Sequence, residues 1–277
     1  MESGFTKLIE PNELLGILDE QTTVVLDVRF SLADPDLGER EYNNGHISGA
    51  YYLNLNTDLS SQPTPTSGRH PLPSAETLAS KLRGCGMENN SQVVAYDDSN
   101  GAIAGRMWWL LRWLGHTNVA VLNGGLSNWI RQGYDVVTAI PKERHGAFEG
   151  NAQEDLVIST AELEDALANE SIRLVDARAA DRYAGKHEPI DPIAGHIPGA
   201  ENHPFQSNLN SDGCFKSADE LQKLHLAGDN VVCMCGSGVT ACHNILATVI
   251  AGNKMPKLYV GSWSEWIRDS RHQFVRE

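Results

Sequence analysis

Short apolar runs alternate with segments of helical periodicity along this chain. The runs at 93–96 and 231–234 are short, continuous and rich in valine, which is typical of strands buried on both faces. The segment 160–168 has leucines four residues apart and begins at a cap formed by Ser159 or Thr160, so it predicts an amphipathic helix. Strands that alternate with helices in this way predict an α/β fold built on a parallel sheet with helices on both faces.

The chain also repeats itself. The motif Leu-Asp-Val-Arg at 26–29 returns as Val-Asp-Ala-Arg at 175–178, and Gly-His-Ile-Ser-Gly-Ala at 45–50 returns as Gly-His-Ile-Pro-Gly-Ala at 195–200. Later segments match as well, among them those that begin at Gly124 and at Gly261. A tandem duplication is therefore expected, with one α/β domain in each half.

The spacing between matching positions changes along the repeat. It is 150 residues from His46 to His196 but 137 residues from Gly124 to Gly261. The first copy therefore holds an insertion of roughly a dozen residues within 54–82, where four prolines predict irregular chain. The predicted organisation is an N-terminal domain at 1–138, a polar linker at 139–156 and a C-terminal domain at 157–277.

Composition narrows the class of protein. The 277 residues are 41% hydrophobic and 21% charged, which is ordinary for a globular protein. A net charge of −14 argues against binding to nucleic acid or to an anionic membrane. The five cysteines do not form the pattern of a secreted disulfide framework, and the segment 1–11 lacks the apolar core of a signal peptide. A reducing cytoplasm is the expected location.

The strongest chemical signal follows the strand at 231–234. Cys235 stands at the end of this strand, and Gly236 and Gly238 allow the next residues to curl into a tight loop of inward-facing N–H groups. The loop leads directly into an apolar helix that reaches Ile250. Converging N–H groups and a helix N-terminus both favour an anion, and therefore a thiolate, at this place. We expect Cys235 to be a nucleophile.

Other uses of this cysteine are less well supported. Cys233, Cys242 and His243 do not complete a tetrahedral zinc pattern with it, and a disulfide between Cys233 and Cys235 would be strained. A cysteine phosphatase needs an arginine six positions after the nucleophile, where this chain has Ala241. Asp97 stands at the matching position of the first copy, so the first domain is expected to be catalytically inactive.

The paired Asp-x-Arg motifs, the Gly-His-Ile-x-Gly-Ala motifs and the loop Cys-Gly-Ser-Gly-Val-Thr-Ala together resemble a tandem-domain rhodanese of the thiosulfate/3-mercaptopyruvate sulfurtransferase family. The loop is most similar to the 3-mercaptopyruvate branch. The resemblance implies two rhodanese-like domains, each with a parallel five-stranded sheet. It also implies that a cysteine persulfide carries sulfur from a small-molecule donor to a thiophilic acceptor such as cyanide, a thiol or thioredoxin. No cofactor is required.

The resemblance also suggests a set of site residues. Arg182 is expected to bind the anionic group of the donor. The mercaptopyruvate enzymes usually have a second arginine directly after a Glu-Pro pair, but Glu188-Pro189 is followed here by Ile190 and Asp191. The loop also lacks the basic side chains that thiosulfate enzymes place there. The catalytic candidates are Cys235 and Ser237; the substrate-binding candidates are Arg182, Gly236, Gly238, Val239 and Thr240; further candidates are Asp36, Arg69 and Lys186.

Two functional hypotheses follow from these residues. The first is an enzyme that uses 3-mercaptopyruvate, or alternatively thiosulfate, as sulfur donor. The second is a sulfur carrier or regulatory module that hands the persulfide of Cys235 to a protein partner. The intact cysteine loop together with Arg182 favours the enzyme.

Overall fold

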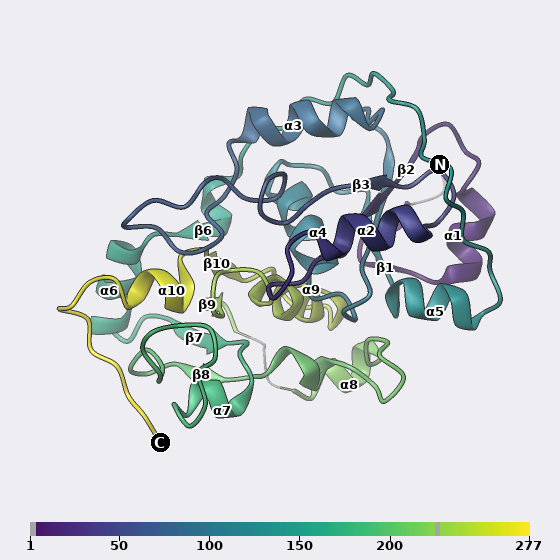
Figure 1. Ribbon diagram of the computed structural model, residues 1–277. Coiled ribbons are helices and arrows are strands. Elements are labelled where there is room, and N and C mark those ends of the chain that lie inside the picture. Colours follow the sequence, from purple (N-terminus) through teal and green to yellow (C-terminus); the bar gives the residue numbers. More distant parts are fainter. Residues whose placement is uncertain (1–3, 225–227) are drawn as a thin grey trace. The chain divides into compact units, whose positions relative to one another are not determined.

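The computed structural model describes residues 4–224 and 228–277 (Figure 1). Residues 1–3 of the N-terminal segment, for which no signal peptide was expected, lie outside the described residues. The chain divides into two compact units. Unit 1 comprises Met1–Ser61, Pro73–Gln153 and Asn210–Phe215, and unit 2 comprises Gln62–Leu72, Glu154–Leu209 and Lys216–Glu277. Each half of the chain therefore contributes one short segment to the other half's unit.

Unit 1 is built on a five-stranded parallel sheet with the strand order β1-β5-β4-β2-β3. Every residue of β2 is buried, so both faces of this strand are covered, as is typical of a parallel sheet. The strands are β1 (Leu8–Ile9), β2 (Thr23–Asp27), β3 (Tyr51–Tyr52), β4 (Gln92–Tyr96) and β5 (Val119–Leu122). The helices are α1 (Pro11–Ile17), α2 (Leu37–Asn44), α3 (Ala75–Gly84), α4 (Ala104–Trp113) and α5 (Gly125–Arg131).

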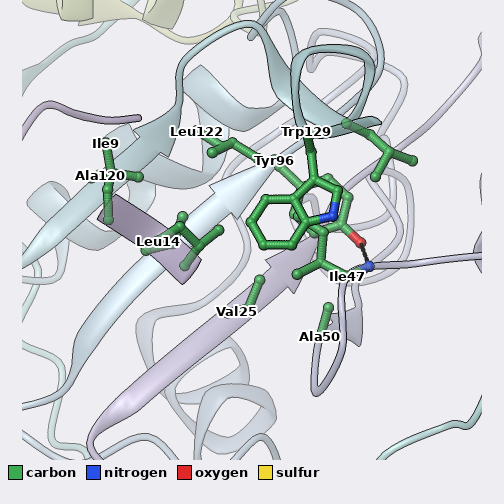
Figure 2. Packing of buried hydrophobic residues seen from close by; sticks show 11 residues of the cluster. Ile9, Leu14, Val25, Ile47, Ala50, Tyr96, Ala120, Leu122 and Trp129 are labelled. Atoms are coloured by element: carbon green, nitrogen blue, oxygen red, sulfur yellow. Dashed lines mark hydrogen bonds between the residues drawn. The ribbon is translucent and has the colours of Figure 1, made fainter. Parts of the chain in front are cut away.

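The core of unit 1 gathers around Trp129 (Figure 2). Trp129 of α5 packs in one cluster with Tyr96 of β4 and with the aliphatic side chains of Leu14 and Val25. The hydroxyl of Tyr96 accepts a hydrogen bond of 3.1 Å from the backbone N–H of Ile47, so the one polar atom of this ring is satisfied. Burial of side chains of this size contributes about 1.5–3 kcal/mol each to stability.

Unit 2 repeats this architecture with the strand order β6-β10-β9-β7-β8, again entirely parallel. The strands are β6 (Val157–Ile158), β7 (Arg173–Asp176), β8 (Glu201–Asn202), β9 (Val231–Met234) and β10 (Lys257–Tyr259). The α-helices are α6 (Thr160–Ala168), α7 (Ala180–Tyr183), α8 (Ala218–Gln222), α9 (Ala241–Ile250) and α10 (Ser262–Trp266), and the 3-10 helices are η1 (Glu154–Leu156) and η2 (Phe205–Asn208).

The repeated Asp-x-Arg motif makes the same buried contacts in both units. In unit 2 the guanidinium of Arg178 donates to the carboxylate of Asp176 and to the carbonyl of Gly195. Arg29 makes the equivalent bonds to Asp27 and Gly45 in unit 1. A strand end is thereby fixed to the Gly-His turn in each unit. The duplication supports a structural role for these ion pairs.

The elements agree closely with the sequence pattern. The helix α6 has the predicted bounds, and the side chain of Ser159 caps it by accepting from the N–H of Glu162. The helix α4 begins at Ala104, where the N–H groups of Ile103 and Ala104 donate to the carboxylate of Asp97. The α/β fold class is confirmed, whereas the linker boundaries remain a prediction. Within the described residues, no helix is both long and apolar enough to cross a membrane.

Candidate active site

The loop after β9 is fixed by the beginning of α10. The carbonyls of Cys235 and Gly236 accept hydrogen bonds from the N–H groups of Trp263 and Ser264 at 3.0 and 2.9 Å. The N–H of Cys235 donates to the hydroxyl of Ser262 at 3.1 Å. The position of the cysteine is therefore set by two backbone N–H groups and a serine hydroxyl of a neighbouring element rather than by the loop alone.

The second glycine of the loop is required by its backbone. Gly238 has a φ of +76°, which side-chain-bearing residues rarely adopt. A Cβ atom at this position would also lie 2.5 Å from the carbonyl oxygen of Val260. The loop can therefore turn tightly and lead into α9 directly, as the sequence predicts.

Several backbone donors of the loop are not used by the protein. Within the part of the chain that the structure describes, the N–H groups of Gly236, Ser237, Val239 and Thr240 have no acceptor. Cys235 is only 2% exposed. Unused donors at a buried helix start suit a negatively charged sulfur, because buried N–H groups without an acceptor are costly.

The other two cysteines nearby have different surroundings. Cys233 is buried within β9, and this burial raises the pKa of its thiol well above the ordinary value. The Sγ of Cys242 donates to the carbonyl of Gly238 at 3.3 Å. None of the five cysteines, which all lie within the described residues, forms a disulfide. Of these three cysteines, Cys235 is therefore the one whose thiol lies at the loop.

The matching loop of unit 1 shows how such a turn accommodates an anion. Asp97 follows β4 as Cys235 follows β9, and its buried carboxylate accepts four backbone hydrogen bonds. The donors are the N–H groups of Ser99 and Gly101 at 2.9 Å and of Ile103 and Ala104 at 2.8 Å. Burial raises the pKa of Asp97, and these N–H groups act in the opposite direction. A carboxylate therefore fills the place that a sulfur anion would occupy in unit 2.

The inserted segment 62–72 belongs to unit 2 and is bonded to α10. The N–H of Gly68 donates to Oε2 of Glu265 at 3.2 Å, and the N–H of Arg69 donates to the hydroxyl of Ser264 at 3.0 Å. Figure 1 shows this segment as the blue loop close to α10. A Cβ atom on Gly68 would lie 2.5 Å from the carbonyl of Gly261, so only glycine permits this approach. The residues that follow Gly68 are thereby fixed beside the cysteine loop.

Two arginines meet at Gly236. A Cβ atom built on Gly236 would lie 3.0 Å from Nη2 of Arg69 and 3.4 Å from both Nη atoms of Arg182. Arg69 comes from the inserted segment and Arg182 from α7. The structure thus brings Arg182 and Arg69, two of the residues singled out from the sequence, next to the residue that follows Cys235.

Two buried carboxylates hold these guanidinium groups. Asp191 accepts from Nη1 of Arg69 through one oxygen and from Nη2 of Arg182 at 3.1 Å through the other. Glu188 accepts from Nε of Arg182 at 3.1 Å. Both carboxylate side chains are only 3% exposed, whereas Arg182 is 17% and Arg69 25% exposed. The carboxylates therefore lie behind the guanidinium groups, which keep the access to solvent.

The two carboxylates titrate differently. Burial raises the pKa of Asp191 above its ordinary value, although the positive charge of Arg69 opposes this effect. Burial acts in the same direction on Glu188, but hydrogen bonds from Arg182 and from the backbone N–H groups of Asp191 and Ile190 outweigh it and lower its pKa.

Ser237 is bonded to a histidine that the sequence did not single out. The hydroxyl of Ser237 and Nδ1 of His70 are 2.8 Å apart, and both residues are buried. His70 directly follows Arg69 on the inserted segment. In the sequence, only its position next to Arg69 could have drawn attention to His70, because the segment has no periodic pattern.

The remaining predicted residues lie in various surroundings. Val239 is buried, and Thr240 takes the N-cap position of α9 without using its hydroxyl as a cap. Asp36 is exposed before α2 in unit 1. Lys186 is exposed, and within the described residues it forms no ion pair. The same part of the chain contains no group of three or more His, Cys, Asp or Glu residues that could hold a metal ion.

Comparison with known proteins agrees with this fold. A family model described as a rhodanese-like domain matches residues 10–132 and again 159–269. A probable 3-mercaptopyruvate sulfurtransferase of Pseudomonas aeruginosa is 45% identical over 273 residues, which cover 96% of each chain. A putative thiosulfate sulfurtransferase of Mycobacterium tuberculosis, SseB, is 38% identical over 280 residues, covering 97% of this chain and 96% of the relative.

A solved structure supports the same family assignment. SseA from Escherichia coli, described under the rhodanese fold and the catalytic mechanism of 3-mercaptopyruvate sulfotransferases, matches with a TM-score of 0.83 at 30% identity. The match covers 94% of this chain and all of that one (100%). The chain therefore belongs to the rhodanese family, with two rhodanese-like domains in tandem. The family and the fold class predicted from the sequence are both confirmed.

Proposed function

We propose that this protein is a sulfurtransferase in which Cys235 accepts a sulfane sulfur from an anionic donor and passes it on from a persulfide. The observation that carries the proposal is the meeting of three features at one loop: a buried cysteine, unused backbone N–H donors, and the guanidinium groups of Arg69 and Arg182 at Gly236. The names of the relatives support the same chemistry.

The reaction has two displacement steps. The thiolate of Cys235 attacks the thiol sulfur of 3-mercaptopyruvate or the outer sulfur of thiosulfate, and a new S–S bond forms on the cysteine. With 3-mercaptopyruvate the C–S bond breaks, its electron pair stays on the enolate of pyruvate, and this enolate then takes a proton. With thiosulfate the S–S bond breaks and sulfite leaves with the electron pair. A thiophilic acceptor then attacks the outer sulfur of the persulfide and releases the Cys235 thiolate.

The loop stabilises the charged states of this cycle. The persulfide and the thiolate are both anions, and unused N–H groups at the start of α9 favour negative charge there. The acceptor is a small thiophile such as cyanide or a thiol, with thioredoxin as a protein thiol of the same kind. The five cysteines do not form the pattern of a secreted disulfide framework, and on that pattern we place the activity in the cytoplasm.

We favour 3-mercaptopyruvate as the donor and keep thiosulfate as the alternative. The second arginine expected after Glu188-Pro189 is absent, but Arg69 supplies a guanidinium group at the loop from a different part of the chain. Two guanidinium groups with N–H donors left over suit a carboxylate, which they can bind through both oxygens. Steady-state sulfur transfer to cyanide with each donor tests the proposal; Cys235-dependent turnover supports it, and none with either donor overturns it.

Truncation of Arg182 to alanine is expected to raise the KM for the donor by about 10–100-fold, because one charged hydrogen-bonding group of the anion site is lost. The kcat should change less, since Cys235 and its loop remain. Arg69→Ala should act in the same direction. The exposed Arg271, which forms an ion pair with Asp269, provides a control through Arg271→Ala, which should leave both constants unchanged. A large fall in kcat at an unchanged KM would contradict a donor-binding role.

Replacement of Ser237 by alanine is expected to separate the two donors. The enolate released from 3-mercaptopyruvate must be protonated, whereas sulfite leaves without a proton. If the hydroxyl of Ser237, bonded to His70, delivers this proton, kcat with 3-mercaptopyruvate should fall by about 10²-fold and kcat with thiosulfate should change little. Ser270→Ala, at an exposed position, is the control. Equal losses with both donors would show that Ser237 only shapes the loop.

A further inference from the structure

Four charged side chains form one cluster beside Gly236, and their charges cancel. Arg69 and Arg182 contribute two positive charges, and Asp191 and Glu188 contribute two negative ones. Arg178 lies 3.6 Å from Glu188, but it is already paired with Asp176. The anion site is therefore rich in N–H donors while its net charge is close to zero.

We propose that Asp191 sets the donor preference of the site, because its negative charge selects a monoanionic carboxylate donor over dianionic thiosulfate. This inference rests on the proposed function and concerns the same loop. Asp191 bridges the two arginines, one carboxylate oxygen to each, so among the ion pairs of the described residues it is the partner that both arginines share.

The contacts of Asp191 and Glu188 determine which N–H groups of the two arginines remain for a donor. Asp191 occupies Nη1 of Arg69, and Glu188 and Asp191 occupy Nε and Nη2 of Arg182. Among the nitrogen atoms left over are Nη2 of Arg69 and Nη1 of Arg182, and both lie within 3.4 Å of the Cβ position on Gly236. Nε of Arg69 also has no partner within the described residues, but it is buried. A donor is therefore bound by hydrogen bonds from two fixed groups. It does not meet an excess of positive charge.

The two donors respond differently to such a site. The carboxylate of 3-mercaptopyruvate has one negative charge and two coplanar oxygens, which match two converging N–H groups. Thiosulfate has two negative charges, so it loses about twice as much attraction when the site is neutralised. At an effective dielectric constant of about 20 and a separation of roughly 5–6 Å, one elementary charge changes the binding of a monoanion on the order of 100-fold. Because both arginines are partly exposed, solvent screening reduces this effect, and we expect about tenfold between the donors.

The test is the ratio of kcat/KM for thiosulfate to kcat/KM for 3-mercaptopyruvate in Asp191→Asn. The substitution keeps the shape of the side chain and leaves the cluster with one net positive charge. The ratio should rise about tenfold relative to the wild type. Glu188→Gln removes a different negative charge from the same cluster and should also raise the ratio. This second variant keeps the test decisive if Asp191→Asn folds poorly. Asp181→Asn, at an exposed position beside Arg182, removes the same charge without these contacts and should leave the ratio unchanged.

The outcomes separate this inference from the proposed function. A raised ratio in both cluster variants, with Asp181→Asn unchanged, supports the role of Asp191. An unchanged ratio in a wild-type background that turns over through Cys235 overturns this inference alone. Equal losses with both donors would also overturn it, because they would mean that Asp191 only holds the arginines in place. A wild type that turns over neither donor overturns the proposed function and this inference with it.

Discussion

Replacement of Cys235 by serine is expected to abolish sulfur transfer with every donor while the protein stays folded. A hydroxyl of similar size fits the same buried position, but it is a far weaker nucleophile toward sulfur and cannot form a persulfide. Because the backbone of the loop is bonded to the hydroxyl of Ser262 and to the N–H groups of Trp263 and Ser264, the substitution removes no hydrogen bond that fixes its shape. We expect kcat/KM to fall by at least about 10³-fold.

Two measurements separate the loss of chemistry from the loss of structure. Steady-state transfer to cyanide reports turnover, and intact mass after incubation with donor alone reports whether one sulfur atom has been added to the chain. Thermal unfolding of Cys235→Ser should match that of the wild type. Cys214→Ser changes a partly exposed cysteine of unit 1 and should retain full transfer. Undiminished transfer by Cys235→Ser, or sulfur added to the variant in the same amount, would contradict the persulfide mechanism.

Much of the fold could be predicted because local and repeated signals agree. The valine-rich strands β4 and β9 are buried on both sides, and the helix α6 has a cap, an apolar face and the bounds that its pattern indicates. The repeat supplied the equivalence of Asp97 and Cys235 before any contact was known. The loop after Cys235 could be recognised because its two glycines and the following helix form one continuous segment.

The rest of the site depends on contacts between residues far apart in the sequence. Arg69 and His70 lie on an irregular segment that is hydrogen-bonded to α10. The hydrophobic pattern of the sequence does not predict such a contact. Arg69 was a candidate on charge alone, and His70 was not identified. Asp191 was noted in the sequence only as a departure from the expected arginine. Its bridging position between Arg69 and Arg182 became visible only when the three side chains were placed in space.

Replacement of Asp97 by asparagine is expected to destabilise unit 1 by about 2–4 kcal/mol, because its buried carboxylate accepts four backbone hydrogen bonds. An amide has one acceptor oxygen, so its NH₂ group would face two N–H donors and leave them unsatisfied. The removal of a buried charge offsets part of this loss, since burial already disfavours the charged form of Asp97. The first unfolding transition should fall by about 5–15 °C.

Asp98→Asn provides the matched control for this prediction. It makes the same chemical change at the next residue, which is exposed, and should shift stability by no more than about 0.5 kcal/mol. Below its unfolding transition, Asp97→Asn should keep the sulfur transfer of the wild type, because the nucleophile and both arginines belong to unit 2. Equal stability of the two variants would contradict the view that Asp97 fills the anion-binding loop of the first repeat. Loss of stability with retained transfer would show that the same loop geometry has different roles in the two copies. In unit 1 it holds a structural carboxylate, and in unit 2 it holds a reactive sulfur.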